Sequence, residues 1–131
     1  MGLFFLSALL LAVLAAMVSS TDNQVLYICE SEDPVFLGAY SIGGSNVDDA
    51  PVYSNQHDMS FYRNKGFWYL GNLGPWPPET HYRCVEPEGC NYMSNVPPTS
   101  SEGAWKGSKR FNRDVAPLIS KEPCASKSEE L

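Results

Sequence analysis

Residues 59–70 read MSFYRNKGFWYL, and this stretch decides the fold class. Two runs rich in β-favouring residues, Met59 to Arg63 and Phe67 to Leu70, flank the sequence Asn64-Lys65-Gly66. That sequence is a hairpin signal, because Gly66 can adopt a positive φ. The stretch therefore predicts an antiparallel hairpin that carries aromatic side chains on both faces.

Shorter runs of the same kind lie on both sides of the hairpin. Candidate strands precede it at residues 24–30, 35–42 and 51–55, and another follows at residues 81–86. Gly, Pro and Asn turn residues separate these runs, and no amphipathic stretch of helical length follows residue 20. We therefore expect an all-β fold, a small antiparallel meander or partial barrel.

The length of 131 residues leaves room for one small domain and excludes the large catalytic folds. Residues 1–20 contain no charged side chain and are typical of a secretion signal, with an uncleaved anchor as the alternative. We expect residues 21–105 to form the small β domain and residues 106–131 a polar, irregular C-terminal tail. No membrane span is expected after signal cleavage.

The four cysteines all follow residue 20, and their even number is typical of a disulfide-stabilised secreted domain. Three pairings are possible, of which Cys84–Cys90 with Cys29–Cys124 is preferred. The first pair would close a turn, and the second would join the two ends of the chain. Neither a Cys-x-x-Cys motif nor a Cys-His pair occurs, so we expect no metal site and no cofactor.

The last four residues, Ser128, Glu129, Glu130 and Leu131, resemble the C-terminal retrieval signals of the KDEL type. Such a signal returns resident proteins to the endoplasmic reticulum. Secretion is the first expectation for this chain, and the lumen of the endoplasmic reticulum is the alternative.

The charge balance is acidic, with nine Lys and Arg against fifteen Asp and Glu and a net charge of −6. Nucleic acid is therefore not an expected partner, because domains that bind phosphate backbones carry a basic face. The basic residues gather late in the chain, at Lys106, Lys109, Arg110 and Arg113. This run is interpreted either as a solvated tail or as a contact site for an anionic glycan or a membrane headgroup.

Aromatic residues carry the functional expectation, since the chain holds seven Tyr, three Trp and six Phe. An aromatic platform of Tyr53, Trp68, Tyr69 and Trp76 would bind a protein or a glycan. The alternative is that these rings form the core of a domain short of aliphatic residues. No catalytic residues are assigned, so we expect a non-enzymatic binding module. An accessory protein resident in the endoplasmic reticulum, or a small secreted enzyme or enzyme inhibitor, are the other hypotheses.

A series of short motifs follows one order along the chain. The motifs are Gly38-Ala39-Tyr40, Asn46, Pro51-Val52-Tyr53, Phe61-Tyr62-Arg63, Gly66 to Gly71, Pro97-Pro98 and Gly103-Ala104-Trp105. Their order resembles a small β module of secreted and multidomain proteins of invertebrates and protists. The resemblance covers roughly residues 36–105 and implies a small β fold. Such modules have no settled activity, so the resemblance assigns no functional residue.

Overall fold

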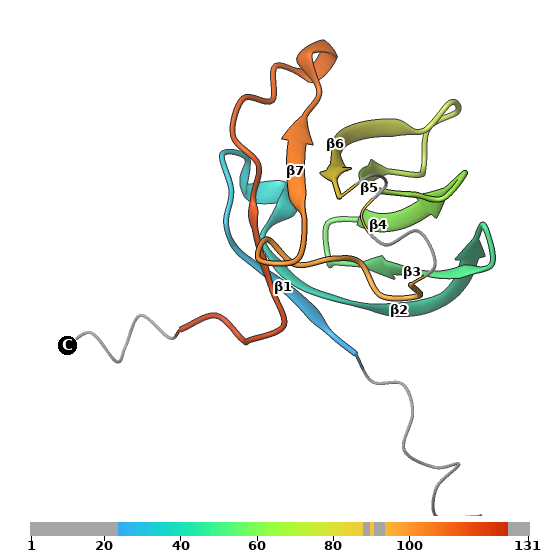
Figure 1. The fold of residues 1–131 in the computed structure, drawn as a ribbon, viewed down its shortest axis with the longest axis horizontal. Coiled ribbons are helices and arrows are strands. Elements are labelled where there is room, and N and C mark those ends of the chain that lie inside the picture. Colours follow the sequence, from blue (N-terminus) through green and yellow to red (C-terminus); the bar gives the residue numbers. More distant parts are fainter. Residues whose placement is uncertain (1–23, 88–89, 91–93, 126–131) are drawn as a thin grey trace, which may run out of the picture.

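The protein is all-β, as expected. The structure is a computed structural model that describes residues 24–87, 90 and 94–125. Eight antiparallel strands form one sheet in the order β7-β6-β5-β4-β3-β2-β1-β8, and the sheet curls into a half-barrel (Figure 1). The strands are β1 (Leu26–Glu30), β2 (Gly38–Val47), β3 (Ala50–Ser54), β4 (Met59–Asn64), β5 (Phe67–Asn72), β6 (Glu79–Glu86), β7 (Ala104–Gly107) and β8 (Leu118–Ser120). Two single 3-10 turns, η1 (Pro34–Phe36) and η2 (Lys109–Phe111), complete the described elements.

The predicted hairpin is formed by β4 and β5. Its pairs run without interruption from Met59 opposite Asn72 to Asn64 opposite Phe67. The two-residue turn between the strands has positive φ at both Lys65 (52°) and Gly66 (84°). Positive φ at both positions matches the right-handed twist of the flanking strands, which is why such turns close tight hairpins.

Strand β2 bends the sheet. Its register against β3 shifts between Ile42, which faces Tyr53, and Asn46, which faces Pro51. Gly43 and Gly44 lie in this interval, and Gly44 has a φ of 92°. Additional residues on one strand of a pair increase its local bend and twist, so this irregularity helps the sheet to curl.

The concave face of the sheet holds the core. Phe61, Leu70 and Tyr82 are direct neighbours across β4, β5 and β6, and all three are buried. The ring of Phe61 packs edge-on against Tyr40 (4.8 Å between centroids) and Trp105 (5.6 Å). The remaining buried core residues are Leu26, Ile28, Phe36, Ala50, Tyr53, Trp68, Cys84, Cys90 and Ile119.

The proline-containing segment 94–100 packs against this core. The Tyr53 hydroxyl donates to the carbonyl of Asn95 (3.1 Å), and the Trp105 indole nitrogen donates to the carbonyl of Pro98 (3.1 Å). Ser100 reaches β8, since its amide donates to the carbonyl of Ile119 (3.0 Å) and its hydroxyl accepts from the Ile119 amide (2.8 Å). The segment thus joins the interior of the half-barrel to its β8 edge.

The sheet extends beyond the expected domain boundary at residue 105. Strand β7 continues to Gly107 beside β6, and β8 pairs with β1. Between and after these strands, the described chain has one 3-10 turn, η2, and is otherwise irregular. Strand β8 has three residues, which is too short for an alternating pattern to be visible in the sequence.

Both expected disulfides are present. Cys29–Cys124 ties β1 to the chain beyond β8 across a sequence separation of 95, and Cys84–Cys90 closes a short loop after β6. Within the described part of the chain, no helix is long and apolar enough to cross a membrane. The expected signal (residues 1–20) and the retrieval motif (residues 128–131) lie outside the described residues.

Candidate binding site on the outer face of the sheet

Strand alternation places a row of four large polar side chains on the outer face of the sheet. Tyr62 faces Tyr69, Tyr69 faces Arg83, and Arg83 faces Lys106, so the row crosses β4, β5, β6 and β7. Residues directly opposite one another point to the same face. The neighbouring positions on the same strands face the other way, and most of them, such as Phe61, Leu70 and Tyr82, belong to the core.

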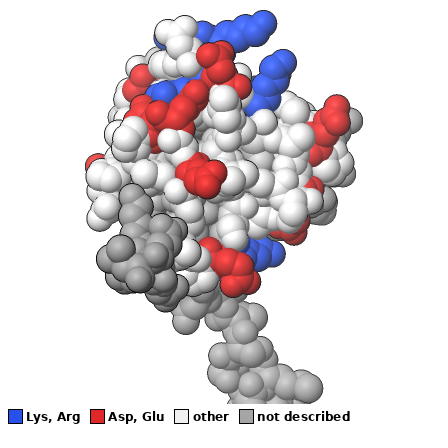
Figure 2. Space-filling model, turned by 90° about the vertical axis from the view of Figure 1, so that its left-hand side faces the viewer, with Lys and Arg blue, Asp and Glu red and all other residues white. Residues whose placement is uncertain are grey.

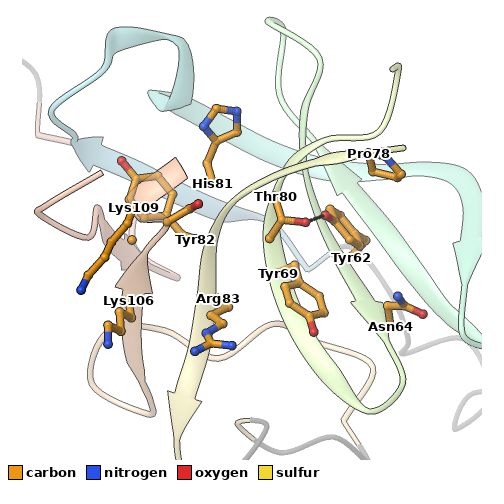
Figure 3. Close-up of a pocket in the computed structure, with 12 residues that line it drawn as sticks. Tyr62, Asn64, Tyr69, Pro78, Thr80, His81, Tyr82, Arg83, Lys106 and Lys109 are labelled. Carbon is orange, nitrogen blue, oxygen red and sulfur yellow. Dashed lines mark hydrogen bonds between the residues drawn. The ribbon is translucent and has the colours of Figure 1, made fainter. Parts of the chain in front are cut away.

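This row lines an open pocket of about 540 Å³ (Figure 3). Residues of the same strands, of the β5–β6 loop and of the segment at η2 complete its walls. The other lining residues are Asn64, Pro78, Thr80, His81, Tyr82, Gly107, Ser108 and Lys109. None of the twelve described residues around the pocket is acidic, although the whole chain carries a net charge of −6.

A half-buried tyrosine, Tyr69, stacks on a buried one, Tyr62, in the pocket. The Tyr62 and Tyr69 rings are stacked, with centroids 5.6 Å apart and planes inclined by 26°. Tyr62 is 4% exposed, and its hydroxyl shares a hydrogen bond of 2.5 Å with the Thr80 hydroxyl (Figure 3). Burial raises the pKa of Tyr62, so the phenol stays neutral at physiological pH. Tyr69 is only half-buried, so part of its side chain is accessible in the pocket.

Three cations lie on one side of these tyrosines (Figure 3). Arg83, Lys106 and Lys109 are exposed, and none of them forms an ion pair within the part of the chain that the structure describes. By contrast, Arg63 pairs with Asp48 (3.4 Å). Figure 2 shows most of the visible basic side chains near the end of the molecule where Figure 1 places η2, with acidic side chains among them and below them.

His81 lines the pocket but belongs to the packing of the fold. Its Nδ1 accepts a hydrogen bond from Arg113 Nε (3.2 Å), and its ring contacts those of Phe36 (5.3 Å) and Phe111 (4.3 Å). Arg113 also pairs with Asp33 (2.9 Å), beside η1. Burial and the nearby guanidinium lower the pKa of His81, which keeps the imidazole neutral at pH 7.

The expected platform of four aromatic contacts does not form, and this prediction requires correction. Trp68 is 0% exposed and Tyr53 is 1% exposed, so neither side chain can contact a ligand at the surface. Tyr69 lies in the pocket. Trp76 is 91% exposed in the loop before β6, two residues from Pro78 at the pocket wall. Trp68 and Tyr69 cannot share one platform, because side chains of successive strand residues point to opposite faces of the sheet.

The structure divides the basic run at the end of the chain. Lys106 and Lys109 reach the pocket, whereas Arg113 pairs with Asp33 and Arg110 lies over the Phe111 ring (5.4 Å). The interpretation of the run as a solvated tail therefore does not hold for Arg113. The other expectation for the run, an anionic contact site, remains a prediction for Lys106 and Lys109.

Sequence reasoning missed Tyr62, Thr80 and Arg83 as pocket residues. The available signal was the alternation of β4 and β6, which puts Tyr62 out when Phe61 is in, and Arg83 out when Tyr82 is in. Which of the two alternating sets faces the core is decided by long-range packing. Only the register of β6 against β5 and β7 then places Arg83 between Tyr69 and Lys106.

Outside this pocket, the acidic and histidine residues that the structure describes form no cluster of metal-binding size. Asp48, at the β2–β3 turn, accepts hydrogen bonds from Arg63 and from the Gly66 amide, and His57 and Asp58 lie in an exposed turn. Among the described residues, no group of three His, Cys, Asp or Glu side chains could hold a metal ion.

Comparison with known proteins finds no relative. No protein family, no curated protein and no solved structure matches this chain.

Proposed function

We propose that this protein is a non-enzymatic binding module of the secretory pathway, and that it binds a carbohydrate or a protein through the pocket on its outer face. The observation that carries the proposal is the pocket itself. It combines a stacked pair of tyrosines with three exposed cations, all presented by paired strands and η2.

The construction of the pocket favours recognition. Tyr62 is fixed by its stacking on Tyr69 and by its bond to Thr80, so the aromatic surface is preorganised. A rigid aromatic ring next to a few polar groups is typical of sites that bind small polar ligands. Groups held by strands also lose little conformational entropy on binding, which preserves affinity.

The groups around the pocket lack the properties of a catalytic set. His81 is neutral and already accepts a hydrogen bond from Arg113, and the pKa of Tyr62 is raised. All four cysteines are in disulfides. Catalysis of group transfer needs an activated nucleophile with a base in reach, and no lining residue has that arrangement. These properties support a binding role over a catalytic one.

A binding screen with the Tyr69→Ala variant tests the proposal. The protein without the expected signal (residues 21–131) is tested on a glycan array and in pulldown from extracellular fluid. We expect the ligands that it binds not to bind to the Tyr69→Ala variant. Tyr27→Ala is a matched control, because Tyr27 is a half-buried tyrosine on β1 outside the pocket. Circular dichroism checks that both variants remain folded. Unchanged binding by folded Tyr69→Ala contradicts the proposed site.

Localisation is proposed to be extracellular. The two disulfides are consistent with a secreted or lumenal protein. The alternative, an accessory protein of the endoplasmic reticulum, rests on the retrieval-like end at Ser128 to Leu131. Expression with an internal tag distinguishes them: secretion of the intact chain supports the first, whereas retention that is relieved by deletion of Leu131 supports the second.

A further inference from the structure

We propose that the pocket on the outer face takes an anionic saccharide, a sulfated or carboxylated oligosaccharide. This inference rests on the proposed binding function and specifies its ligand class. Three observations carry it: a pair of like charges in register across two strands, an aromatic ring in the same row, and a third cation held in place by the fold.

The first observation is the direct pairing of Arg83 with Lys106. These residues face each other across β6 and β7, and both side chains line the pocket. Like charges directly opposite one another destabilise a strand pair. No carboxylate among the described residues forms an ion pair with either cation, in a chain that contains fifteen acidic residues. A ligand with two or more negative groups would relieve this repulsion.

The second observation is the position of Tyr69 next to Arg83. Tyr69, Arg83 and Lys106 occupy one row across three adjacent strands, which spans about 10 Å at the usual strand spacing. That length is comparable to a disaccharide. The ring of Tyr69 suits the apolar face of a sugar, and the Arg83 guanidinium can donate two parallel hydrogen bonds to a sulfate or carboxylate.

The third observation is the fixed position of Lys109. The chain around η2 is tied down, since the Ser108 amide donates to the carbonyl of His81 (2.8 Å) and the Arg113 amide donates to the carbonyl of Ser108 (3.0 Å). Figure 3 shows Lys109 and Lys106 on the same side of the pocket. Lys109 is thus a third anchor at a defined place, which a ligand of several anionic units can use.

The shape of the site favours a saccharide over a membrane surface. The cations line one side of a pocket of about 540 Å³ that has a tyrosine ring in its wall. A lipid surface is contacted by protruding groups, whereas a hollow of this kind encloses a ligand that can enter it. Anionic vesicles therefore serve as a competing probe in the test.

The test uses the mature chain and two hexasaccharides. Titration calorimetry compares a heparin-derived hexasaccharide with neutral chitohexaose. We expect the anionic sugar to bind, and the neutral one to bind at least about tenfold more weakly, because the cations then have no partner. Raising the salt concentration should weaken the anionic complex strongly and the neutral one little.

Charge reversal at Lys106 separates binding from folding. Lys106→Glu places a carboxylate opposite Arg83, so we expect the melting temperature to be unchanged or raised while the affinity for the heparin hexasaccharide falls at least about tenfold. Lys65→Glu is the matched control. Lys65 is exposed and outside the pocket, and its reversal changes the net charge equally.

Four other results would contradict one or both of the proposals. Equal binding of chitohexaose, lost by Tyr69→Ala, overturns the anionic specificity and leaves the proposed binding function intact. Binding of phosphatidylserine vesicles without binding of the hexasaccharide overturns the saccharide as ligand. Equal loss with Lys65→Glu and Lys106→Glu shows a general charge effect and overturns the site. Absence of any ligand that Tyr69→Ala abolishes overturns both proposals.

Discussion

Both faces of strands β4 to β6 carry aromatic residues, but the two faces differ in burial and in their other side chains. On the inner face, Phe61, Leu70 and Tyr82 form a buried row. On the outer face, the row of Tyr62, Tyr69 and Arg83 lines an open pocket. The two rows interleave along each strand, and adjacent residues such as Trp68 and Tyr69 therefore belong to different faces.

This difference teaches that aromatic content alone does not indicate a binding surface. The inner rings are fixed by packing from all sides, and the outer pair is fixed by mutual stacking and one hydrogen bond. Substitutions on the inner face should lower stability, and those on the outer face should lower ligand affinity. The following changes test that separation.

Trp68→Ala should have the largest effect on stability. Removing a fully buried indole leaves a cavity, and such changes cost about 3–5 kcal/mol. Tyr69→Ala, one residue away on the other face, should cost clearly less, because its ring is half-exposed. Urea unfolding of the two variants measures the difference. Equal losses of stability would contradict the division between the faces.

Loss of the Cys29–Cys124 disulfide should be the next largest effect. Replacing both cysteines by alanine should cost about 2–4 kcal/mol, near the upper end of that range, because the bridge closes a separation of 95 residues. The Cys84–Cys90 bridge spans a separation of 6 residues and constrains the unfolded chain less. Since neither bridge lines the pocket, the variant that stays folded should keep its ligand affinity. Thermal unfolding and a binding titration check both statements.

Gly71→Ala should lower stability although residue 71 lies on the outer face of the sheet. Gly71 shares the outer face with Tyr69, yet a side chain there would collide with the backbone carbonyl of Glu79, at the register shift between β5 and β6. Because the obstacle is backbone, β6 would have to move, and we expect a cost of about 1–3 kcal/mol. Gly74→Ala is a milder control, since the Cβ would meet only the Asn72 side chain at 3.2 Å. Thermal unfolding ranks the two variants.

Acidification should weaken the link between His81 and Arg113. The pKa of folded His81 lies below its ordinary value of 6.5, through burial first and Arg113 second, with Glu79 and Asp33 opposing the shift. Below pH 6.5 the unfolded chain therefore binds a proton that the folded chain does not, and the free energy of unfolding falls until the folded pKa is reached. Urea unfolding between pH 7.5 and pH 5 measures the slope. A His81→Gln variant should show a flatter dependence in the same interval.

Trp76→Ala should have the smallest effect on stability. The side chain is 91% exposed, so its removal should change the free energy of unfolding by less than about 0.5 kcal/mol. Because its loop leads into Pro78 at the pocket wall, the change should still reduce the affinity for an extended ligand. Unfolding and binding measurements on the same variant test this. A large loss of stability would contradict this prediction and show that the Trp76 side chain contributes to the packing of the fold.

Much of the fold could be predicted from the sequence. The predicted strands from residue 24 to residue 86 correspond to β1 to β6, and five of the six agree within two residues at both ends, because turn residues mark those ends. Strand β2 instead continues through Gly43 and Gly44 to Val47, five residues past its expected end. The segment 35–42 is an exception in part, since Pro34–Phe36 forms η1 before β2 begins. Strands β7 and β8 have four and three residues, and only their partners β6 and β1 define them.

The candidate site could be predicted less well. Alternation separates Trp68 from Tyr69 in the sequence, but it does not say which of them faces the core. That choice depends on the total packing of distant residues such as Tyr40 and Trp105 against Phe61. The approach of Lys106 to Arg83 depends in addition on the register of β7, which lies far along the chain.

The bonds between Ser100 and Ile119 have a consequence for the behaviour of the protein at high concentration. They occupy the amide and the carbonyl of Ile119 at the β8 edge of the sheet. Open sheet edges recruit strands from other molecules and so promote aggregation. By occupying the middle of β8, Ser100 removes the backbone groups that a second chain would need there, and it therefore protects this edge against intermolecular strand addition.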